Sequence, residues 1–317
     1  MRYFIAWTIS LAATVLGADI IFGQTYPNKP IRIVTAEAGG PADSIARIIA
    51  PEMSGALGQP VIVDNRGGEV IPGEIVSKAP SDGYTLLVIG SNLWLGSLLQ
   101  KTPYDPIRDF SAISLIVVTP SILLVHPTLP IKNVKELIAM AKSRPGALNY
   151  SSSVAGSAPH LAAELFKAMA GVNIVRIPYK GTAPALNGLL SGETQMYFST
   201  LQIPPGIVKS GKVRILAVTS ANPSALVPGV PTVAATLPGY ESKTMRGIFA
   251  PAQTPTSVIN RLNSEVVRVI NEANVKQQFL SLNAEPVGST PGKFAAEMQE
   301  DMAKTGKLIT NIGISAE

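Results

Sequence analysis

The sequence contains no cysteine in its 317 residues. This absence excludes thiol catalysis, disulfide bonds, cysteine-ligated zinc, iron–sulfur clusters and a lipid anchor on an N-terminal cysteine. Histidine is scarce too, and its two copies, His126 and His160, make no recognisable metal-ligating set. We therefore expect neither a metal nor another cofactor.

Clusters of like charge are also missing. The chain has 26 Lys and Arg against 21 Asp and Glu, a formal charge of +5, but the basic residues are scattered and no basic run is interleaved with aromatics. We expect no nucleic-acid partner from this pattern. With 46% hydrophobic residues, the chain can bury the core of one large domain or of two smaller ones.

Residues 1–24 differ from the rest of the chain. Met1 and Arg2 give a short positive start, an apolar stretch follows, and the polar segment "QTYPNKP" ends it. This order is typical of a secretory signal peptide, so we expect an exported, periplasmic protein. The alternative is a single membrane anchor of about 20 apolar residues, although Asp19 interrupts the run. The cleavage position stays open.

After Tyr26, β-rich runs alternate with amphipathic helical stretches. We expect strands at 31–35, 61–65, 84–91, 113–127, 147–152, 174–179, 195–200, 213–220 and 246–252. We expect helices at 45–57, with a kink at Pro51, and at 74–79, 134–142, 161–170, 183–190, 256–271, 274–282 and 291–308. The repeated βαβ succession predicts mostly parallel, doubly wound α/β sheets.

Two extended apolar runs, 113–127 and 246–252, interrupt this alternation and are expected to cross between two lobes. The expected division gives residues 25–124 plus 246–317 to lobe 1 and residues 125–245 to lobe 2. Ligands of such sheets bind outside the carboxyl ends of the strands. The loops that follow each strand are therefore the candidate site.

The first of these loops contains Gly39 and Gly40, directly before Pro41. Proline suits the first position of a helix, and free amides at a helix N-terminus favour an anion. The alternative is a tight turn without a ligand, and the G-x-G-x-x-G pattern of a dinucleotide site is absent. The segment "GIVKSGK" (206–212) imitates a phosphate-binding loop, but Val213 stands where Ser or Thr must hold magnesium.

Small hydroxyl and glycine loops recur at the other strand ends. Ser91 and Asn92 follow the third strand, Ser151 to Ser157 precede a helix, "YKGTAPA" (179–185) precedes the next, and Ser199 and Thr200 end another strand. Such groups can hold a small carboxylate and are weak acid or base catalysts. A serine hydrolase using Ser157 and His160 remains an alternative, although no G-x-S-x-G motif is present.

Long motifs run in order through nearly the whole chain after Tyr26. They include "GQPVIVDNRGG" (58–68), "APSDGYTLL" (79–87), "YDPIRDFSAIS" (104–114), "NYSSSVAGSAPH" (149–160), "IPYKGTAPALNGLLSG" (177–192) and "GKVRILAVTS" (211–220). With them the chain resembles the Bug receptors, also called TctC-like, which are periplasmic solute-binding proteins of tripartite tricarboxylate transporters. The resemblance implies a type II periplasmic-binding-protein fold of two lobes and two crossing strands, without catalysis.

It further implies a cleft that closes on a small organic carboxylate, a membrane permease as partner, and action as a monomer. Carried over motif by motif, it implies ligand contacts from Ala36, Glu37, Ala38, Gly39, Gly40, Ser91, Ser153, Ser157, Lys180, Gly181, Thr182, Phe198, Ser199 and Thr200. Asn92, beside Ser91, joins this predicted set.

The chain departs from the family pattern at two of these positions. Ala36-Glu37 stands where many members have an apolar, proline-containing pair, and Ser199 stands where many have aspartate. A carboxylate at Glu37 would repel a second anionic group or pair with an ammonium or hydroxyl. A monoacid, an amino acid or an amide-bearing acid is thus as compatible as a tricarboxylate. A receptor that reports to a sensor kinase also stays open.

Overall fold

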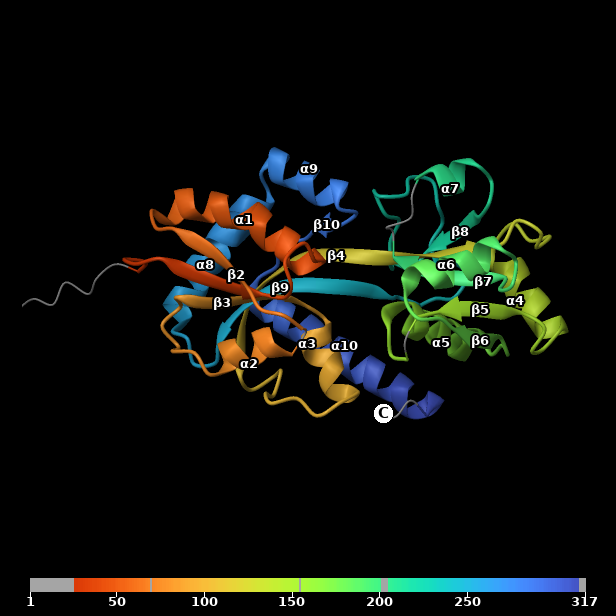
Figure 1. Ribbon diagram of the computed structural model, residues 1–317, viewed down its shortest axis with the longest axis horizontal. Helices are drawn as coiled ribbons and strands as arrows, with labels where there is room; N and C mark the ends of the chain where they lie inside the picture. The colour runs from red at the N-terminus through yellow and green to blue at the C-terminus, as the bar shows by residue number, and fades with distance from the viewer. Residues whose placement is uncertain (1–25, 69, 154, 201–204, 314–317) are drawn as a thin grey trace, which may run out of the picture.

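The computed structural model describes residues 26–68, 70–153, 155–200 and 205–313. Residues 1–24, the predicted signal peptide or anchor, lie outside these ranges. Within them, every helix is too short or too polar to span a bilayer. Two α/β units lie side by side along the longest axis of the molecule, and strands β4 (Phe110–Val125) and β9 (Lys243–Pro251) run between them (Figure 1).

The remaining elements follow the predicted alternation. The strands are β1 (Ile31–Thr35), β2 (Val61–Asn65), β3 (Thr85–Gly90), β5 (Asn149–Ser152), β6 (Val175–Pro178), β7 (Met196–Thr200), β8 (Arg214–Val218) and β10 (Glu285–Pro286). The α-helices are α1 (Pro41–Leu57), α2 (Ile71–Ser77), α3 (Asn92–Leu95), α4 (Val134–Ser143), α5 (Ala158–Ala170), α6 (Thr182–Leu190), α7 (Pro205–Lys209), α8 (Thr256–Ile270), α9 (Ala273–Ser281) and α10 (Pro291–Ile312).

Lobe 1 is built on the sheet order β2-β1-β3-β9-β4. Successive strand residues point to opposite faces, and here both faces are apolar. Ile33 and Val88 pack on the side of α1, α8 and α9, while Val34 and Ile89 pack on the side of α2, α3 and α10. Helices on both faces are what a doubly wound sheet requires.

Lobe 2 repeats this plan with the second half of β4 joined to β7, β5 and β6 on one side and to β8 on the other. Ile122 and Leu124 pack toward α6 and α7, and Leu123 and Val125 pack toward α4 and α5. One strand thus contributes to the cores of both lobes.

The connection between the lobes is formed where β4 passes from one sheet to the other. Pro120 is the last β4 residue that pairs with β9, and Ser121 is the first that pairs with β7. The Thr219 hydroxyl accepts from the Ser121 amide at 2.7 Å and lies 2.6 Å from the Ser242 carbonyl oxygen. Buried Thr219 therefore ties the two crossing strands together at the hinge.

Two features differ from the sequence-based prediction. The sheets are mixed, because β4 and β9 cross between the lobes in opposite directions and pair antiparallel. The short elements α3, α7 and β10 were not predicted, because elements of so few residues show no periodicity. Helix α1 contains the solvent-exposed Pro51, where a kink was predicted, and ends at Leu57, with Gly58 as its C-cap.

Candidate ligand-binding cleft

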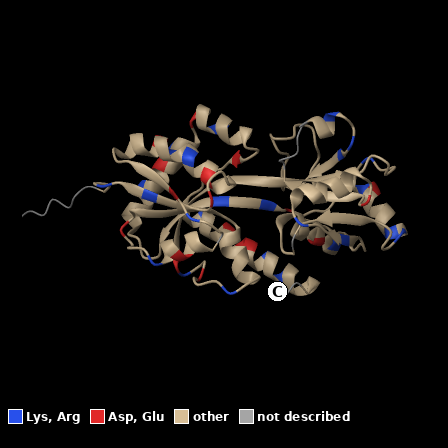
Figure 2. Cartoon of the chain, in the orientation of Figure 1, with Lys and Arg blue, Asp and Glu red and all other residues tan. Residues whose placement is uncertain are grey.

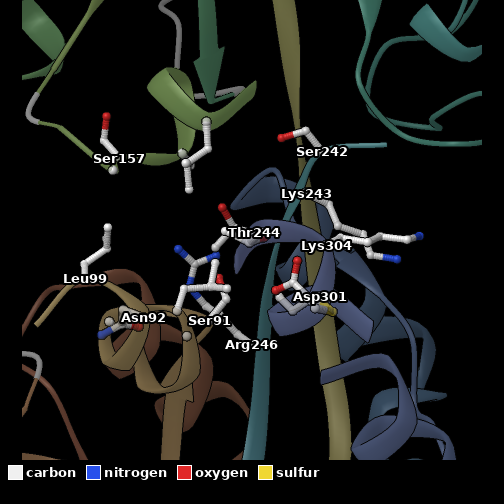
Figure 3. Close-up of a pocket in the computed structure, with 18 of the residues that line it drawn as sticks. Ser91, Asn92, Leu99, Ser157, Ser242, Lys243, Thr244, Arg246, Asp301 and Lys304 are labelled. Carbon is white, nitrogen blue, oxygen red and sulfur yellow. The ribbon is translucent and has the colours of Figure 1, made fainter. Parts of the chain in front are cut away.

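A cavity of about 1130 Å³ lies between the lobes. Lobe 1 contributes the loop from β1 to α1 and the start of α3, and lobe 2 contributes residues 155–158 and α5. The hinge end of β9 and one face of α10 complete the lining, as Figure 3 shows. The cavity is therefore where a single molecule could contact both lobes at once.

The structure brings six of the predicted site residues to this cavity. From lobe 1 they are Ala36, Glu37, Gly40, Ser91 and Asn92, and from lobe 2 Ser157. Glu37 is exposed, and the Ser91 amide donates to the Met245 carbonyl at 2.9 Å. Strand β3 thus ends against β9 at the cavity.

The other predicted residues do not line the cavity. They are Ala38, Gly39, Ser153, Lys180, Gly181, Thr182, Phe198, Ser199 and Thr200. The Ser153 carbonyl accepts from Arg176 at 2.9 Å, and the Ser199 hydroxyl donates to the Thr200 carbonyl at 2.8 Å. Those two polar groups already have partners within lobe 2.

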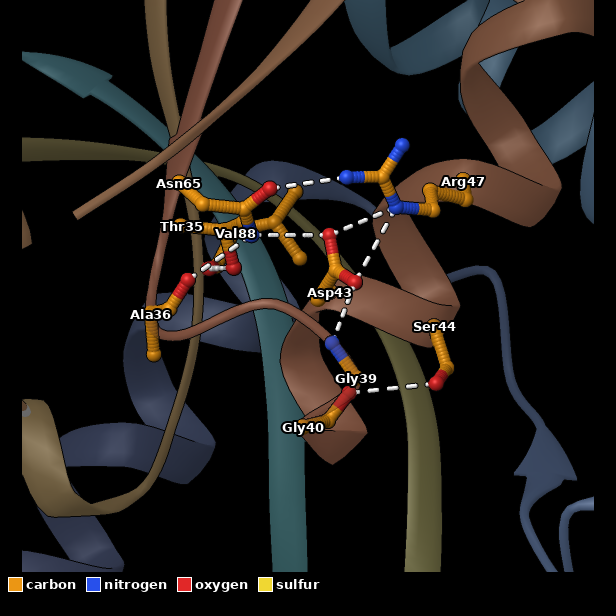
Figure 4. A network of polar contacts seen from close by, with 9 residues as sticks. All are labelled: Thr35, Ala36, Gly39, Gly40, Asp43, Ser44, Arg47, Asn65 and Val88. Atoms are coloured by element: carbon orange, nitrogen blue, oxygen red, sulfur yellow. Dashed lines mark hydrogen bonds and ion pairs between the residues drawn. The ribbon is translucent and has the colours of Figure 1, made fainter. Parts of the chain in front are cut away.

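The glycine loop before α1 uses its amides internally (Figure 4). With a positive φ of 79°, Gly39 turns its N–H toward the helix and donates to Asp43 at 2.8 Å. The Gly40 amide donates to the Glu37 carbonyl at 3.2 Å. The anion at this helix N-terminus is therefore the protein's own Asp43 carboxylate, which satisfies the N-terminal preference for negative charge.

Asp43 is the centre of a polar network that holds the cavity-facing loop. Asn65 donates to Asp43 at 2.8 Å and to the Ala36 carbonyl at 2.9 Å, and Arg47 donates to Asp43 at 3.0 Å. Burial alone would raise the pKa of the Asp43 carboxyl, but hydrogen bonds from Arg47, Gly39 and Asn65 outweigh burial and lower the pKa. Asp43 is thus ionised, and it positions Ala36 indirectly.

Ser157 offers a free hydroxyl from lobe 2. It is the residue before α5, with an extended backbone, but its side chain caps no helix amide. Its Oγ is buried and has no hydrogen-bond partner among the described residues. A buried hydroxyl without a partner costs free energy, and Figure 3 draws this oxygen turned away from Leu99 and the other lobe 1 residues.

Arg246 supplies the positive charge of the cleft. It pairs with Gly90 in the β3–β9 register, and alternation places it on the same face of β9 as Ile248. The guanidinium is drawn beside Ser91 and Thr244 in Figure 3. The sequence analysis did not single out Arg246, although a lone arginine at the start of the apolar run "RGIFAPA" (246–252) could have indicated it.

No carboxylate among the described residues neutralises the Arg246 charge. Its hydrogen bond goes to the Thr119 hydroxyl at 3.3 Å, and no carboxylate of the described residues lies within 4.0 Å. Burial lowers the pKa of Arg246, yet an arginine side chain stays protonated in proteins. A partly buried cation without a carboxylate favours an anionic ligand.

Two lysines along the cleft are already paired. Lys243 lies 3.0 Å from Glu241 and 3.8 Å from Glu297, and Lys304 lies 2.6 Å from Glu300. Burial raises the pKa of Asp301, which accepts a 2.8 Å hydrogen bond from the Trp94 indole. These groups line the α10 side of the cleft and leave Arg246 as its uncompensated hinge cation.

Part of the cleft wall is apolar. Its leucines come from both lobes: Leu95, Leu99, Leu161, Leu165 and Leu308. A methyl group added at Gly156 would lie 2.5 Å from Leu99, so the lobes meet at this point. The cleft can therefore accept a ligand with a charged end and a hydrocarbon part.

The hydrolase alternative lacks its central hydrogen bond. His160 Nδ1 accepts from the Gly156 amide at 3.0 Å, while Ser157 Oγ is without a partner among the described residues. A serine nucleophile is activated by a base within hydrogen-bond reach. His160 instead fixes the loop before α5.

We expect His160 to make folding stability depend on pH. Burial, followed by the nearby Arg176 charge, lowers the pKa of His160 to about 4, against about 6.5 in an unfolded chain. Because the unfolded state binds the proton more tightly, stability is full above pH 6.5 and falls by about 3 kcal/mol as the pH drops to 4. Urea unfolding of native protein and His160→Gln across this range measures the effect. A His160→Gln chain with an unchanged pH dependence would refute it.

Comparison with known proteins agrees with this architecture. The TctC family, described as the tripartite tricarboxylate transporter family receptor, matches residues 45–314. A structure of R. palustris Rpa4515 with adipate is 34% identical and covers 92% of this chain and 100% of its own, with a TM-score of 0.72. The periplasmic binding protein BugD is 30% identical, with 92% and 100% covered and a TM-score of 0.68.

A third solved structure is a TctC solute-binding protein from Polaromonas without ligand. It is 26% identical, covers 90% of this chain and 100% of its own, and has a TM-score of 0.82. BugD and the Polaromonas protein are binding proteins, and the matched family is one of receptors rather than enzymes. The family match over most of the chain, together with the two-lobed fold, shows that this chain belongs to the TctC, or Bug, family of solute-binding receptors.

Proposed function

We propose that this protein is exported and captures a small organic carboxylate between its lobes, for delivery to the membrane permease of a tripartite transporter. The predicted signal peptide supports export, and the receptor family supports the permease as the partner. We propose further that the receptor acts as a monomer.

The observation that carries this proposal is the uncompensated charge of Arg246 in the cleft. A carboxylate can accept two parallel hydrogen bonds from a guanidinium, a geometry that lysine cannot provide. We propose that the Ser157 hydroxyl, which has no partner among the described residues, turns toward the cleft when a ligand is bound and donates from the opposite lobe. Each hydrogen bond to a charged group contributes about 1.5–3 kcal/mol, so a ligand that reaches both residues favours the closed arrangement of the lobes.

Size and shape favour a small acid with a hydrocarbon part. The leucines of the cleft wall would contact methylene groups, and a relative with 34% identity is known with adipate, a dicarboxylate. Glu37, exposed at the cleft, would repel each further anionic group of a ligand after the first and so disfavour a tricarboxylate most. We therefore propose mono- and dicarboxylates, including amino acids, ahead of tricarboxylates.

We infer that the lobes are set more nearly as in the ligand-free relative than as in the adipate-bound relative. The TM-score is higher with the ligand-free relative at 26% identity, 0.82, than with the adipate-bound relative at 34% identity, 0.72. Backbone similarity within a lobe normally follows sequence identity, so the reversed order indicates a difference in how the lobes are set. Closure of the lobes onto a ligand would then remove this difference from the adipate-bound relative.

Thermal denaturation with a panel of organic acids tests this function. Protein is first unfolded and refolded to remove retained ligand, then heated with mono-, di- and tricarboxylates and with amino acids. A ligand at one hundred times its Kd stabilises the folded state by about 2.7 kcal/mol, so at least one acid should raise the Tm clearly. Native mass spectrometry of freshly purified protein should show the same acid retained.

Trp94 provides a second readout in the same experiment. The sequence has two tryptophans, and Trp7 lies in the predicted signal peptide, so a chain that begins at residue 25 has Trp94 alone. Its indole donates to Asp301 beside the cleft, and lobe closure should change its fluorescence. If no acid in the panel shifted either the Tm or the fluorescence, carboxylate capture would be refuted.

A further inference from the structure

The charge of this protein is divided unequally between the lobes. Residues 121–242, which form lobe 2, contain ten Lys and Arg against four Glu and no Asp, a formal charge of +6. All other residues together carry −1, which restores the total of +5. The scattered basic residues of the sequence thus become a property of one lobe once the chain is folded.

Six of these basic residues form what we call the distal patch. They are Lys132, Lys135, Lys142, Arg144, Lys209 and Lys212. All six are exposed, and none lies within 4.0 Å of a carboxylate among the described residues. In Figure 2 the ends of α4 and α7 in lobe 2, away from lobe 1, are marked mainly in blue.

Hydrogen bonds of Arg214, in β8, bring Lys132 and Lys212 to the same end of the lobe 2 sheet, although α4 and α7 pack on its opposite faces. Arg214 pairs with Val125 in the sheet and donates to the carbonyl oxygens of Pro127 and Ile131. The segment that leads to Lys132 and α4 is therefore fixed beside β8, and Lys212 lies two residues before β8 begins. On α4, Lys135 and Lys142 are seven residues apart and share a helix face.

The acidic residue nearest to the patch in sequence is already engaged. Glu136 accepts from the Lys132 amide at 2.6 Å and from the Asn133 side chain at 2.8 Å, and so caps α4. It does not pair with a lysine ammonium group among the described residues. The patch therefore presents several solvated ammonium groups to whatever lies outside the protein.

We propose that the distal patch binds anionic phospholipid headgroups, so that lobe 2 holds the receptor against the membrane surface. This goes beyond ligand capture, which depends on the cleft rather than on the patch. Five of the six residues are lysines, whose compact charges suit a diffuse negative surface, whereas arginine is preferred for bidentate contacts with a protein carboxylate. Each basic residue near an anionic bilayer contributes about 1 kcal/mol of attraction. Several such residues acting together therefore suffice for reversible binding.

Vesicle co-sedimentation tests the proposal on the chain from residue 25. Native protein should bind vesicles of mixed phosphatidylglycerol and phosphatidylcholine, release them at about 1 M salt, where the Debye length is about 3 Å, and ignore pure phosphatidylcholine. Lys135→Glu with Lys212→Glu should weaken this binding about tenfold or more. Both residues are exposed and free of ion pairs among the described residues, so the fold should be retained.

A matched control carries the same change in net charge on lobe 1. Lys101→Glu with Lys293→Glu, both exposed, should leave vesicle binding within about twofold of native, because neither lies in the patch. Equal losses in both double variants, or no preference of native protein for phosphatidylglycerol, would overturn the proposal. If native protein bound none of these vesicles, lipid binding would be wrong, and the patch would instead fit an acidic protein surface. The organic acid that raises the Tm of native protein should raise the Tm of both double variants as well. The vesicle experiment can therefore fail without carboxylate capture failing, and the reverse.

Discussion

Replacing Arg246 by methionine should weaken carboxylate binding by at least about thirtyfold. Loss of one partner from a buried, hydrogen-bonded charge pair costs about 2–5 kcal/mol, and the fold-change follows from about 1.4 kcal/mol per factor of ten. Calorimetric titration with the acid that gives the largest thermal shift measures the loss. Methionine fills a similar volume, so the effect reports on charge and hydrogen bonding rather than on a cavity.

The same substitution should raise the Tm of the ligand-free protein. The guanidinium is held in the hinge without a carboxylate partner among the described residues, and a desolvated charge of this kind destabilises the folded state. Loss of binding together with a gain in stability would separate a ligand-binding role from a structural one. If Arg246 had a structural role instead, its replacement would lower the Tm of the ligand-free protein.

Lys307→Met is the matched control for Arg246→Met. Lys307 also lines the cleft, but it is exposed, and its charge is screened by water. Its replacement should change the Kd by less than about twofold. If Arg246→Met bound the acid as tightly as Lys307→Met, the anion-binding role of the hinge arginine would be wrong.

Replacing Asp43 by alanine should lower the free energy of unfolding by about 3 kcal/mol. Asp43 is 3% exposed and accepts from Gly39, Asn65 and Arg47, so its removal leaves buried donors without an acceptor. Ligand affinity should fall as well, because Asn65 would no longer hold the Ala36 carbonyl in a fixed position. Urea unfolding and titration measure the two effects separately.

The deficit of Asp43→Ala should depend on pH in a defined direction. The folded-state pKa of Asp43 is lowered, so its contribution is present above the unfolded pKa near 4 and is lost as the pH falls through the folded value. The difference between native and variant should therefore shrink below about pH 4. A deficit that stayed constant into strong acid would contradict the charged network.

Glu74→Ala is the control for this substitution. Glu74 pairs with Lys78 at 2.6 Å, but the two side chains are 39% and 65% exposed, and such pairs contribute about 0.5 kcal/mol or less. A loss at Asp43 no larger than the loss at Glu74 would show that burial of the network has no energetic consequence.

Local pattern was sufficient for most of the fold. Strands β1 and β3 are recognisable because both of their faces are apolar, and α8, α9 and α10 begin within one residue of their predicted starts. Pairing direction was not readable in the same way. The antiparallel placement of β9 beside β3 and β4 joins residues far apart in sequence, and hydrophobic periodicity carries no information about such partners.

The glycine loop before α1 shows that local sequence pattern is also insufficient to predict the contacts of the site. The sequence by itself determined the turn, the helix start at Pro41 and the preference for an anion there, because these depend on neighbouring residues. Only the tertiary structure decided that Asp43 and the Glu37 carbonyl take the amides of Gly39 and Gly40. It also decided that Arg246 lies beside the end of β3, since that contact exists only after β9 crosses from lobe 2 and pairs with β3.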